Sequence, residues 1–97
     1  MILALLALQL AAETIDLSTD NFGKPFASNV PNDVRLFVID LQACNHFASE
    51  PRGSEPERDR FLTEQTDKHC ARIEERQKQL LERCPGRPDL RALILDE

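Results

Sequence analysis

A chain of 97 residues can form one small domain at most. Hydrophobic residues make up 41% of it and charged residues 30%, which is typical of a soluble folded domain rather than of a disordered tail. The formal net charge is −5, and acidic and basic residues are interleaved through the second half without the basic patch that neutralises phosphates, so we expect no nucleic-acid partner.

An uninterrupted apolar run, MILALLALQLAA, occupies residues 1–12. It has the length of the apolar centre of a secretory signal peptide, and it is shorter than the roughly 20 residues that a helix needs to cross a bilayer. Two alanines end it before a polar Glu-Thr pair, as at a signal peptidase site, although no Lys or Arg precedes it. We predict a signal peptide at 1–12 and a single helical domain at 13–97, periplasmic or secreted, with no stable membrane span once the leader is removed. The alternative is that residues 1–12 are retained as a core helix of a cytoplasmic protein.

Residues 13–32 contain glycine, prolines and scattered small polar residues, with neither the period of a helix nor the alternation of a strand. We therefore predict an extended loop that lies along the domain. Phe22, Phe26 and Val30 are spaced four residues apart in this loop. We expect all three to anchor it to the core.

A central helix is predicted at residues 33–49. Apolar residues recur there every three or four positions, which places them on one helix face. The residues of this face are Val34, Phe37, Val38, Leu41, Cys44 and Ala48. Other apolar residues widen the face, so the helix should be covered on more than one side. Pro51 disfavours helical geometry in the residue before it, and the helix should end near Glu50.

A second helix is predicted at residues 55–84, because Pro56 suits a first helical turn and no further glycine or proline follows within that range. The residues expected on its inner face are Phe61, Leu62, Gln65, His69, Ile73, Leu80 and Leu81. A break near residues 66–72 is the alternative, because a Thr-Asp pair there could restart a helix. A short last helix begins at Pro88. The predicted fold class is therefore all-α, a small helical hairpin with a short C-terminal helix.

Three cysteines allow three pairings, each of which leaves one thiol free. Bridged Cα atoms lie within about 7 Å of one another, whereas Cys70 and Cys84 would be about 21 Å apart on a continuous helix. A bond between Cys44 and Cys84 would require the second helix to fold back on itself. We predict a disulfide between Cys44 and Cys70, which leaves Cys84 outside the pair. A disulfide indicates an oxidising compartment. The alternative is three free thiols in a cytosolic protein.

Cysteine and histidine lie close together at Cys44-x-His46 and at His69-Cys70. Residues two apart on a helix point about 200° apart and adjacent residues about 100° apart, so neither pair suits a shared metal ion. A nucleophile pair of Cys44 with His69 would lack an orienting carboxylate and an oxyanion loop. Three glycines are too few for a phosphate-cradling loop. We therefore expect no metal, no cofactor and no enzymatic activity.

The stretch CNHFASEP at residues 44–51, followed by ERDRFL at residues 57–62 and then Cys70, resembles a group of small, uncharacterised proteobacterial proteins that are predicted to be exported. Their pattern is Cys-x-His-aromatic-x-x-Glu, an acidic helix start containing Arg, and a second cysteine further along. The resemblance covers the middle half of the chain, implies the same pairing of Cys44 with Cys70, and implies no activity. Cys84 has no counterpart in the group, whose members often carry a glycine-containing break after the second cysteine that is absent here.

The expected function is binding or structural, with an unidentified envelope protein as the partner, and the oligomeric state is left open. The residues expected to contact that partner are His46, Glu50, Arg52 and Arg58, near the hairpin turn. The chain is similar in size and style to the small helical inhibitors of lysozyme in bacterial envelopes, whose characteristic residues it lacks. That similarity gives the alternative, an inhibitor of a cell-envelope hydrolase, which predicts a protruding loop at residues 51–56.

The intact mass of the protein recovered from its native host tests the leader and the disulfide together. We expect the mass of a chain that begins at Glu13, lower by two hydrogens because one disulfide has formed. Alkylation without reduction should label one cysteine per molecule. A mass that still includes residues 1–12, or labelling of all three cysteines, would contradict the prediction of export.

Overall fold

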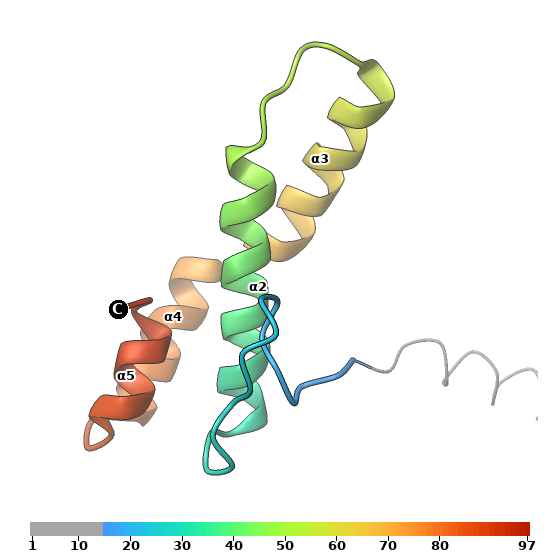
Figure 1. Cartoon of the computed structure of the whole chain (residues 1–97). Coiled ribbons are helices and arrows are strands. Elements are labelled where there is room, and N and C mark those ends of the chain that lie inside the picture. Colours follow the sequence, from blue (N-terminus) through green and yellow to red (C-terminus); the bar gives the residue numbers. More distant parts are fainter. Residues whose placement is uncertain (1–14) are drawn as a thin grey trace, which may run out of the picture.

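Helices dominate the computed structural model of the protein, which describes residues 15–97 (Figure 1). They are α2 (Asn32–Ser49), α3 (Pro56–Cys70), α4 (Ile73–Arg83) and α5 (Pro88–Ile94). No strand occurs within this range, where an isolated β-bridge joins Thr19 to Pro25. The all-α class, the central helix and the short last helix predicted from the sequence are confirmed. The predicted signal peptide lies outside the described residues, and no helix within 15–97 is long and apolar enough to span a membrane.

The axis of the molecule is α2, against which each of the other labelled helices packs (Figure 1). α3 runs beside its C-terminal half, whereas α4 and α5 lie beside its N-terminal half. The loop 15–31 follows the N-terminal half of α2 on another side (Figure 1). α2 is therefore covered on more than one side, as its wide apolar face predicts.

Arg35 of α2 attaches both ends of the loop 15–31 to the helix. The guanidinium donates hydrogen bonds to the carbonyl oxygens of Leu17 (2.9 Å), Ala27 (3.0 Å) and Val30 (2.9 Å). Its Cζ atom also lies 5.5 Å from the centroid of the Phe26 ring, within the range of a cation–π contact. Val30 is buried and Phe26 packs against the core, as predicted.

The hydrophobic core lies between the N-terminal half of α2, α4, α5 and the end of the loop; we call this part the core lobe. The buried residues of its cluster are Val30, Val34, Phe37, Val38, Leu80, Cys84, Leu90 and Ile94. Phe37, Val34 and Ile94 are completely buried. Each full burial of such a side chain contributes about 1.5–3 kcal/mol, so this cluster carries most of the apolar stabilisation.

The C-terminal half of α2, the loop 50–55 and α3 form a projecting part, which we call the distal hairpin (Figure 1). Its interior is small, because among the described residues 44–70 only Cys44 and Leu62 are buried. A disulfide joins Cys44 to Cys70, with Cα atoms 4.9 Å apart, so the predicted pairing is confirmed. Cys84 lies elsewhere, as a free thiol buried in the core lobe.

The prediction of one helix at residues 55–84 is wrong. α3 ends at Cys70 and α4 begins at Ile73, which places the break at the end of the 66–72 range considered as the alternative. Between them Arg72 has φ 54°, in the left-handed region that glycine adopts most easily. No glycine or proline marks this position, and the sequence therefore carries no strong signal for the break.

α3 packs against the C-terminal half of α2 and α4 against its N-terminal half, and the break at residues 71–72 lies between these two contacts (Figure 1). The disulfide ties α3 to the C-terminal half, whereas Leu80 of α4 must reach the core lobe. Asp40 of α2 joins the two helices at the break. One of its carboxylate oxygens lies 3.0 Å from His69 Nδ1, and the other accepts a hydrogen bond from Arg76 at 3.0 Å. The Arg76 guanidinium also lies 5.5 Å from the Phe37 ring centroid.

Replacing both Cys44 and Cys70 by serine should release α3 and leave the core lobe folded. Loss of the cross-link should lower the free energy of unfolding by about 3 kcal/mol, because the unfolded chain gains loop entropy. α3 buries Leu62 and no other residue of its own fully. We therefore expect amide hydrogen exchange, followed by NMR, to show loss of protection in α3 before α5.

The matched control is Cys84→Ser, which removes a core thiol without breaking a cross-link. It should lower protection in α4 and α5 and spare α3. Equal loss of protection in α3 and α5 in the Cys44→Ser, Cys70→Ser variant would contradict the division into a core lobe and a disulfide-dependent hairpin.

Candidate functional site

The four residues predicted to contact a partner lie together on the distal hairpin, but three of them brace the turn. The Arg58 guanidinium donates to the Glu50 carboxylate at 3.1 Å and to the Pro51 carbonyl at 2.7 Å. His46 Nε2 lies 3.6 Å from the other Glu50 oxygen, and its side chain is 63% exposed. The His46 side chain is more exposed than those of Glu50 and Arg58, so its ring is accessible to a partner.

The loop 50–55 is held in place by side chains of α3 and by the Phe47 carbonyl of α2, which accepts from Arg52 at 3.4 Å. Arg52 donates to the Thr66 hydroxyl at 3.0 Å and to the carbonyl of Glu50 at 3.2 Å. The Gly53 amide donates to both carboxylate oxygens of Asp59, at 2.9 and 3.1 Å, with φ 108° that glycine adopts without strain. Arg52 and Arg58 therefore stabilise the loop, and the loop itself projects in a defined conformation.

Phe47 lies at the centre of a group of aromatic rings on the same hairpin. The centroid of its ring is 6.0 Å from that of Phe61 and 5.2 Å from that of His46, both in edge-to-face geometry. The His69 ring stacks on it at 5.9 Å. Edge-to-face and offset arrangements are the favourable ones for aromatic pairs, so Phe47 holds Phe61 and His46 in defined positions.

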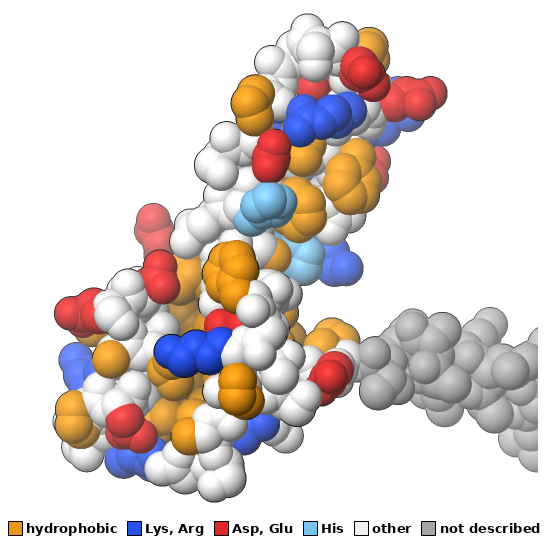
Figure 2. All heavy atoms as spheres, in the orientation of Figure 1, with side chains coloured by type: hydrophobic (Ala, Val, Ile, Leu, Met, Phe, Trp, Pro, Cys, Tyr) orange, Lys and Arg blue, Asp and Glu red, His pale blue; other side chains and the backbone are white. Residues whose placement is uncertain are grey.

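Phe22, from the loop 15–31, extends this group toward the core lobe. Its side chain is 79% exposed, and it lines a hollow of about 290 Å³ together with Gln42, His46 and Phe47. Figure 2 shows hydrophobic and histidine side chains next to one another on the visible face of the molecule. We call the set Phe22, His46, Phe47 and Phe61 the aromatic strip.

The position of Phe22 is set by hydrogen bonds around Asp20. One oxygen of the Asp20 carboxylate accepts from the amides of Phe22 and Lys24, both at 2.9 Å, and the other accepts from Gln42 Nε2 at 3.0 Å. The backbone amide of Asn21 donates a hydrogen bond to Gln42 Oε1 at 3.0 Å. These bonds fasten the turn to α2, so an exposed phenylalanine is carried on an ordered segment.

Phe22 and Phe61 correct two predictions, because both were expected to face the core. Phe61 is 51% exposed and Phe22 is more so, whereas Leu62 is buried. Adjacent residues on a helix point about 100° apart, so Phe61 and Leu62 cannot both face α2. That angle was the sequence signal that could have identified Phe61. Nothing comparable marks Phe22, whose exposed position is set by the hydrogen bonds around Asp20.

The cysteine–histidine pair considered as a nucleophile is not formed. Cys44 is part of the disulfide, and His69 lies against the carboxylate of Asp40. Within residues 15–97, no cluster of three or more His, Cys, Asp or Glu side chains could hold a metal ion.

No protein-family model matches the chain, and no curated protein or solved structure matches it. The resemblance to small exported proteobacterial proteins therefore stays a prediction. The features of the molecule that bear on function are the aromatic strip, the projecting loop and the disulfide that holds the hairpin together.

The attachment of Phe22 should depend on pH through Asp20. Partial burial raises the pKa of this carboxyl, but hydrogen bonds from the Gln42 side chain and from the Lys24 and Phe22 amides outweigh it, so the pKa lies below its usual value. A carboxyl whose folded-state pKa is lowered contributes stability above its unfolded-state pKa of about 3.9 and loses it as the pH falls through the folded-state value. The NMR signals of the Phe22 amide and the Gln42 side chain should be constant above about pH 5 and shift together below about pH 4.

The control for this titration is Asp20→Asn, which keeps a hydrogen-bonding oxygen but does not ionise. The acid transition of the Phe22 amide should disappear in that variant. A transition that persists in Asp20→Asn would show that another group attaches the loop.

Proposed function

We propose that the protein is a small exported binding protein, whose aromatic strip contacts a protein partner in the periplasm. The observation that carries this proposal is the exposure of Phe22 and Phe61 on a cross-linked, internally braced frame. Aromatic residues are enriched among the few side chains that supply most of the energy of protein interfaces. Two exposed aromatic side chains next to Phe47 are therefore a favourable centre for a protein interface.

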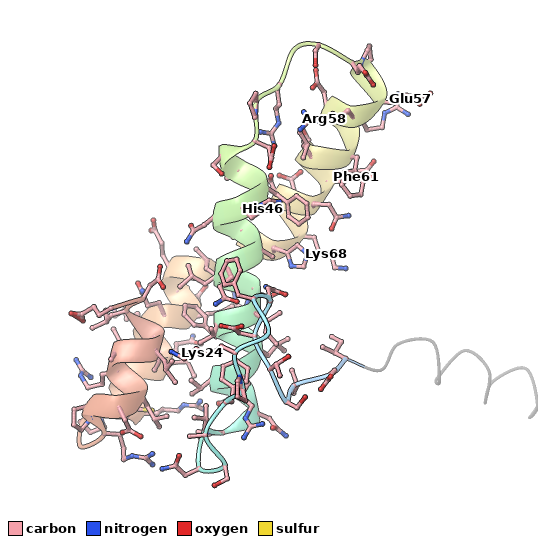
Figure 3. The ribbon with its side chains drawn as sticks, in the orientation of Figure 1. Lys24, His46, Glu57, Arg58, Phe61 and Lys68 are labelled. Carbon is pink, nitrogen blue, oxygen red and sulfur yellow. A yellow bond between two sulfur atoms is a disulfide. The ribbon has the colours of Figure 1, made fainter. Side chains whose placement is uncertain are left out.

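The surroundings of the aromatic strip also fit a protein partner. Glu57, Arg58 and Lys68 come from the same helix as Phe61 and flank it along α3 (Figure 3). An apolar centre with a mixed, charged and solvent-accessible rim is the usual composition of such interfaces. The rim also contains both signs of charge, which favours a defined partner orientation over attraction to any charged surface.

The rigidity of the distal hairpin reduces the entropy that binding would cost. The disulfide limits movement of α3, and hydrogen bonds from Arg52 and Gly53 to side chains of α3 hold the turn. Side chains and loops that must be ordered on binding cost about 0.5–1.5 kcal/mol each. A frame that is ordered in advance avoids part of this cost.

The disulfide and the apolar N-terminal run both support export. Disulfides persist in oxidising environments such as the periplasm and the extracellular space, and are rare in the cytosol. The Cys44–Cys70 bond and the apolar run at residues 1–12 both fit that environment. The disulfide thus supports both parts of the proposal, whereas the exposed aromatic side chains support binding alone and the apolar run supports export alone.

A second candidate is the inhibitor of a cell-envelope hydrolase. The observation in its favour is the loop 50–55, which lies at the far end of the distal hairpin, away from the core lobe (Figure 1). Residues 51–55 are exposed, while Arg52 and Gly53 are held by hydrogen bonds. A projecting and pre-ordered loop can enter an enzyme cleft with little rearrangement.

Photo-crosslinking in the native host distinguishes the two functions. A photoreactive amino acid at Phe61 should give one discrete adduct in the envelope fraction, and Phe22→Ala should reduce it by about tenfold, because loss of a central aromatic costs about 1–2 kcal/mol. The same probe at Ser54 tests the loop. An adduct from Ser54 to a hydrolase, with none from Phe61, favours the inhibitor.

The matched control places the probe at Lys78, an exposed position on α4 of the core lobe. It should give no adduct of the same mass. Equal adducts from Phe61 and Lys78, or none from either Phe61 or Ser54, would contradict binding through the distal hairpin.

A further inference from the structure

A second hollow, away from the tip of the distal hairpin, lies between the loop 15–31 and α5. Its volume is about 370 Å³, near the lower end of the range of ligand-binding clefts. Its apolar lining comes from three separate parts of the chain: Pro25, Phe26, Val30, Val38, Ala92 and Leu93. Val30 and Val38 belong to the core, so the floor of the hollow is a stable surface.

The rim of this hollow is acidic. Asp20, Asp89, Asp96 and Glu97 line it, against Lys24 as the one basic lining residue. We call it the acidic groove. Hydrogen bonds with the Arg87 side chain lower the pKa of Asp89, and that of Asp20 is also lowered, so both carboxyls are ionised at neutral pH.

Two arginines of the adjoining elements are engaged elsewhere, whereas Arg87 pairs with Asp89 on the rim at 2.8 Å. Arg35 donates to the loop carbonyls described above, and Arg91 donates to the Leu81 carbonyl at 3.0 Å. Of the ion pairs found within residues 15–97, none involves Asp20, Asp96 or Glu97. Within residues 15–97, Asp96 and Glu97 therefore have no ion-pair partner, whereas Asp89 is paired with Arg87 and Asp20 feels the charge of Lys24.

Lys24 indicates which side chain suits the acidic groove. It extends from the loop toward α5 (Figure 3), and it lines the same hollow as Ala92 and Leu93. Lysine and arginine can lay an aliphatic stem along an apolar surface while the charged end stays in water. An apolar floor beneath a carboxylate rim offers both halves of that contact.

We propose that the acidic groove binds a short basic segment of a protein partner, in which Lys or Arg alternates with apolar residues. The apolar side chains and stems lie on the floor, and the cationic groups meet the carboxylates of Asp20, Asp96 and Glu97. Nucleic acid and anionic lipid are disfavoured because the rim repels phosphates. This site uses different side chains from the aromatic strip, so it goes beyond the function proposed above and does not depend on it.

The probe is a fluorescein-labelled peptide of alternating leucine and lysine, seven residues long, titrated with the full oxidised chain at low salt and followed by fluorescence anisotropy. The rim variant is Asp96→Asn with Glu97→Gln. Asp96 has φ 59°, which asparagine tolerates better than most residues, so this variant should fold. Two exposed ion pairs contribute about 1 kcal/mol together, and we expect binding to weaken roughly fivefold.

The matched control is Glu64→Gln with Asp67→Asn, which changes the net charge equally on exposed positions of α3. It should change the affinity by less than about twofold, because screened charges at a distance contribute little. Lys24→Met should tighten binding about twofold, since it removes the competing cation and keeps an aliphatic stem. Phe22→Ala and Phe61→Ala should leave the affinity unchanged, which separates this site from the aromatic strip.

Three outcomes would overturn the proposal. The first is no binding, or equal weakening in the rim variant and in the control. The second is equal binding of the peptide in which glutamate replaces lysine. The third is complete displacement of the peptide by spermine at the same concentration of positive charge, which would mean that the acidic groove attracts cations without recognising a peptide.

Discussion

The disulfide between Cys44 and Cys70 is the constraint on which the distal hairpin depends. α3 is rich in charged residues and buries Leu62 alone, so apolar contact cannot by itself hold it against α2. A cross-link acts on the unfolded chain, where it removes conformational freedom whatever the area of the folded interface. The hairpin can therefore keep an exposed aromatic surface, because that surface is not needed to stabilise the fold.

Asp40 connects this hairpin to the core lobe. Its carboxylate contacts His69 at the end of α3 and Arg76 in α4, on either side of the break at Arg72. All three side chains are less than one-third exposed, so solvent screens these contacts less than it screens an ion pair at the surface. The break at Arg72 and the contacts of the Asp40 carboxylate together define the direction in which the distal hairpin projects from the core lobe.

The loop 15–31 connects the two surfaces for which binding is proposed. The Asp20 carboxylate accepts a hydrogen bond from the backbone amide of Phe22, a residue of the aromatic strip. The same carboxylate lines the acidic groove. Gln42, a residue of α2, donates a hydrogen bond to that carboxylate. The aromatic strip offers apolar rings with a mixed rim, whereas the acidic groove offers carboxylates above an apolar floor. The two surfaces thus select different chemistry, although one short turn supports both.

The helical class, the central helix, the last helix and the Cys44–Cys70 bond could be predicted from the amino-acid sequence, because periodicity, proline positions and the reach of a disulfide are local rules or simple distances. The folded structure was needed to locate the break in the second helix, since Arg72 adopts a left-handed conformation without a local signal in the sequence. It also decided that Arg52 and Arg58 brace the turn while Phe22 and Phe61 are exposed. Apolar residues alone do not show whether space remains for them in the core, because that depends on which neighbours have already filled it.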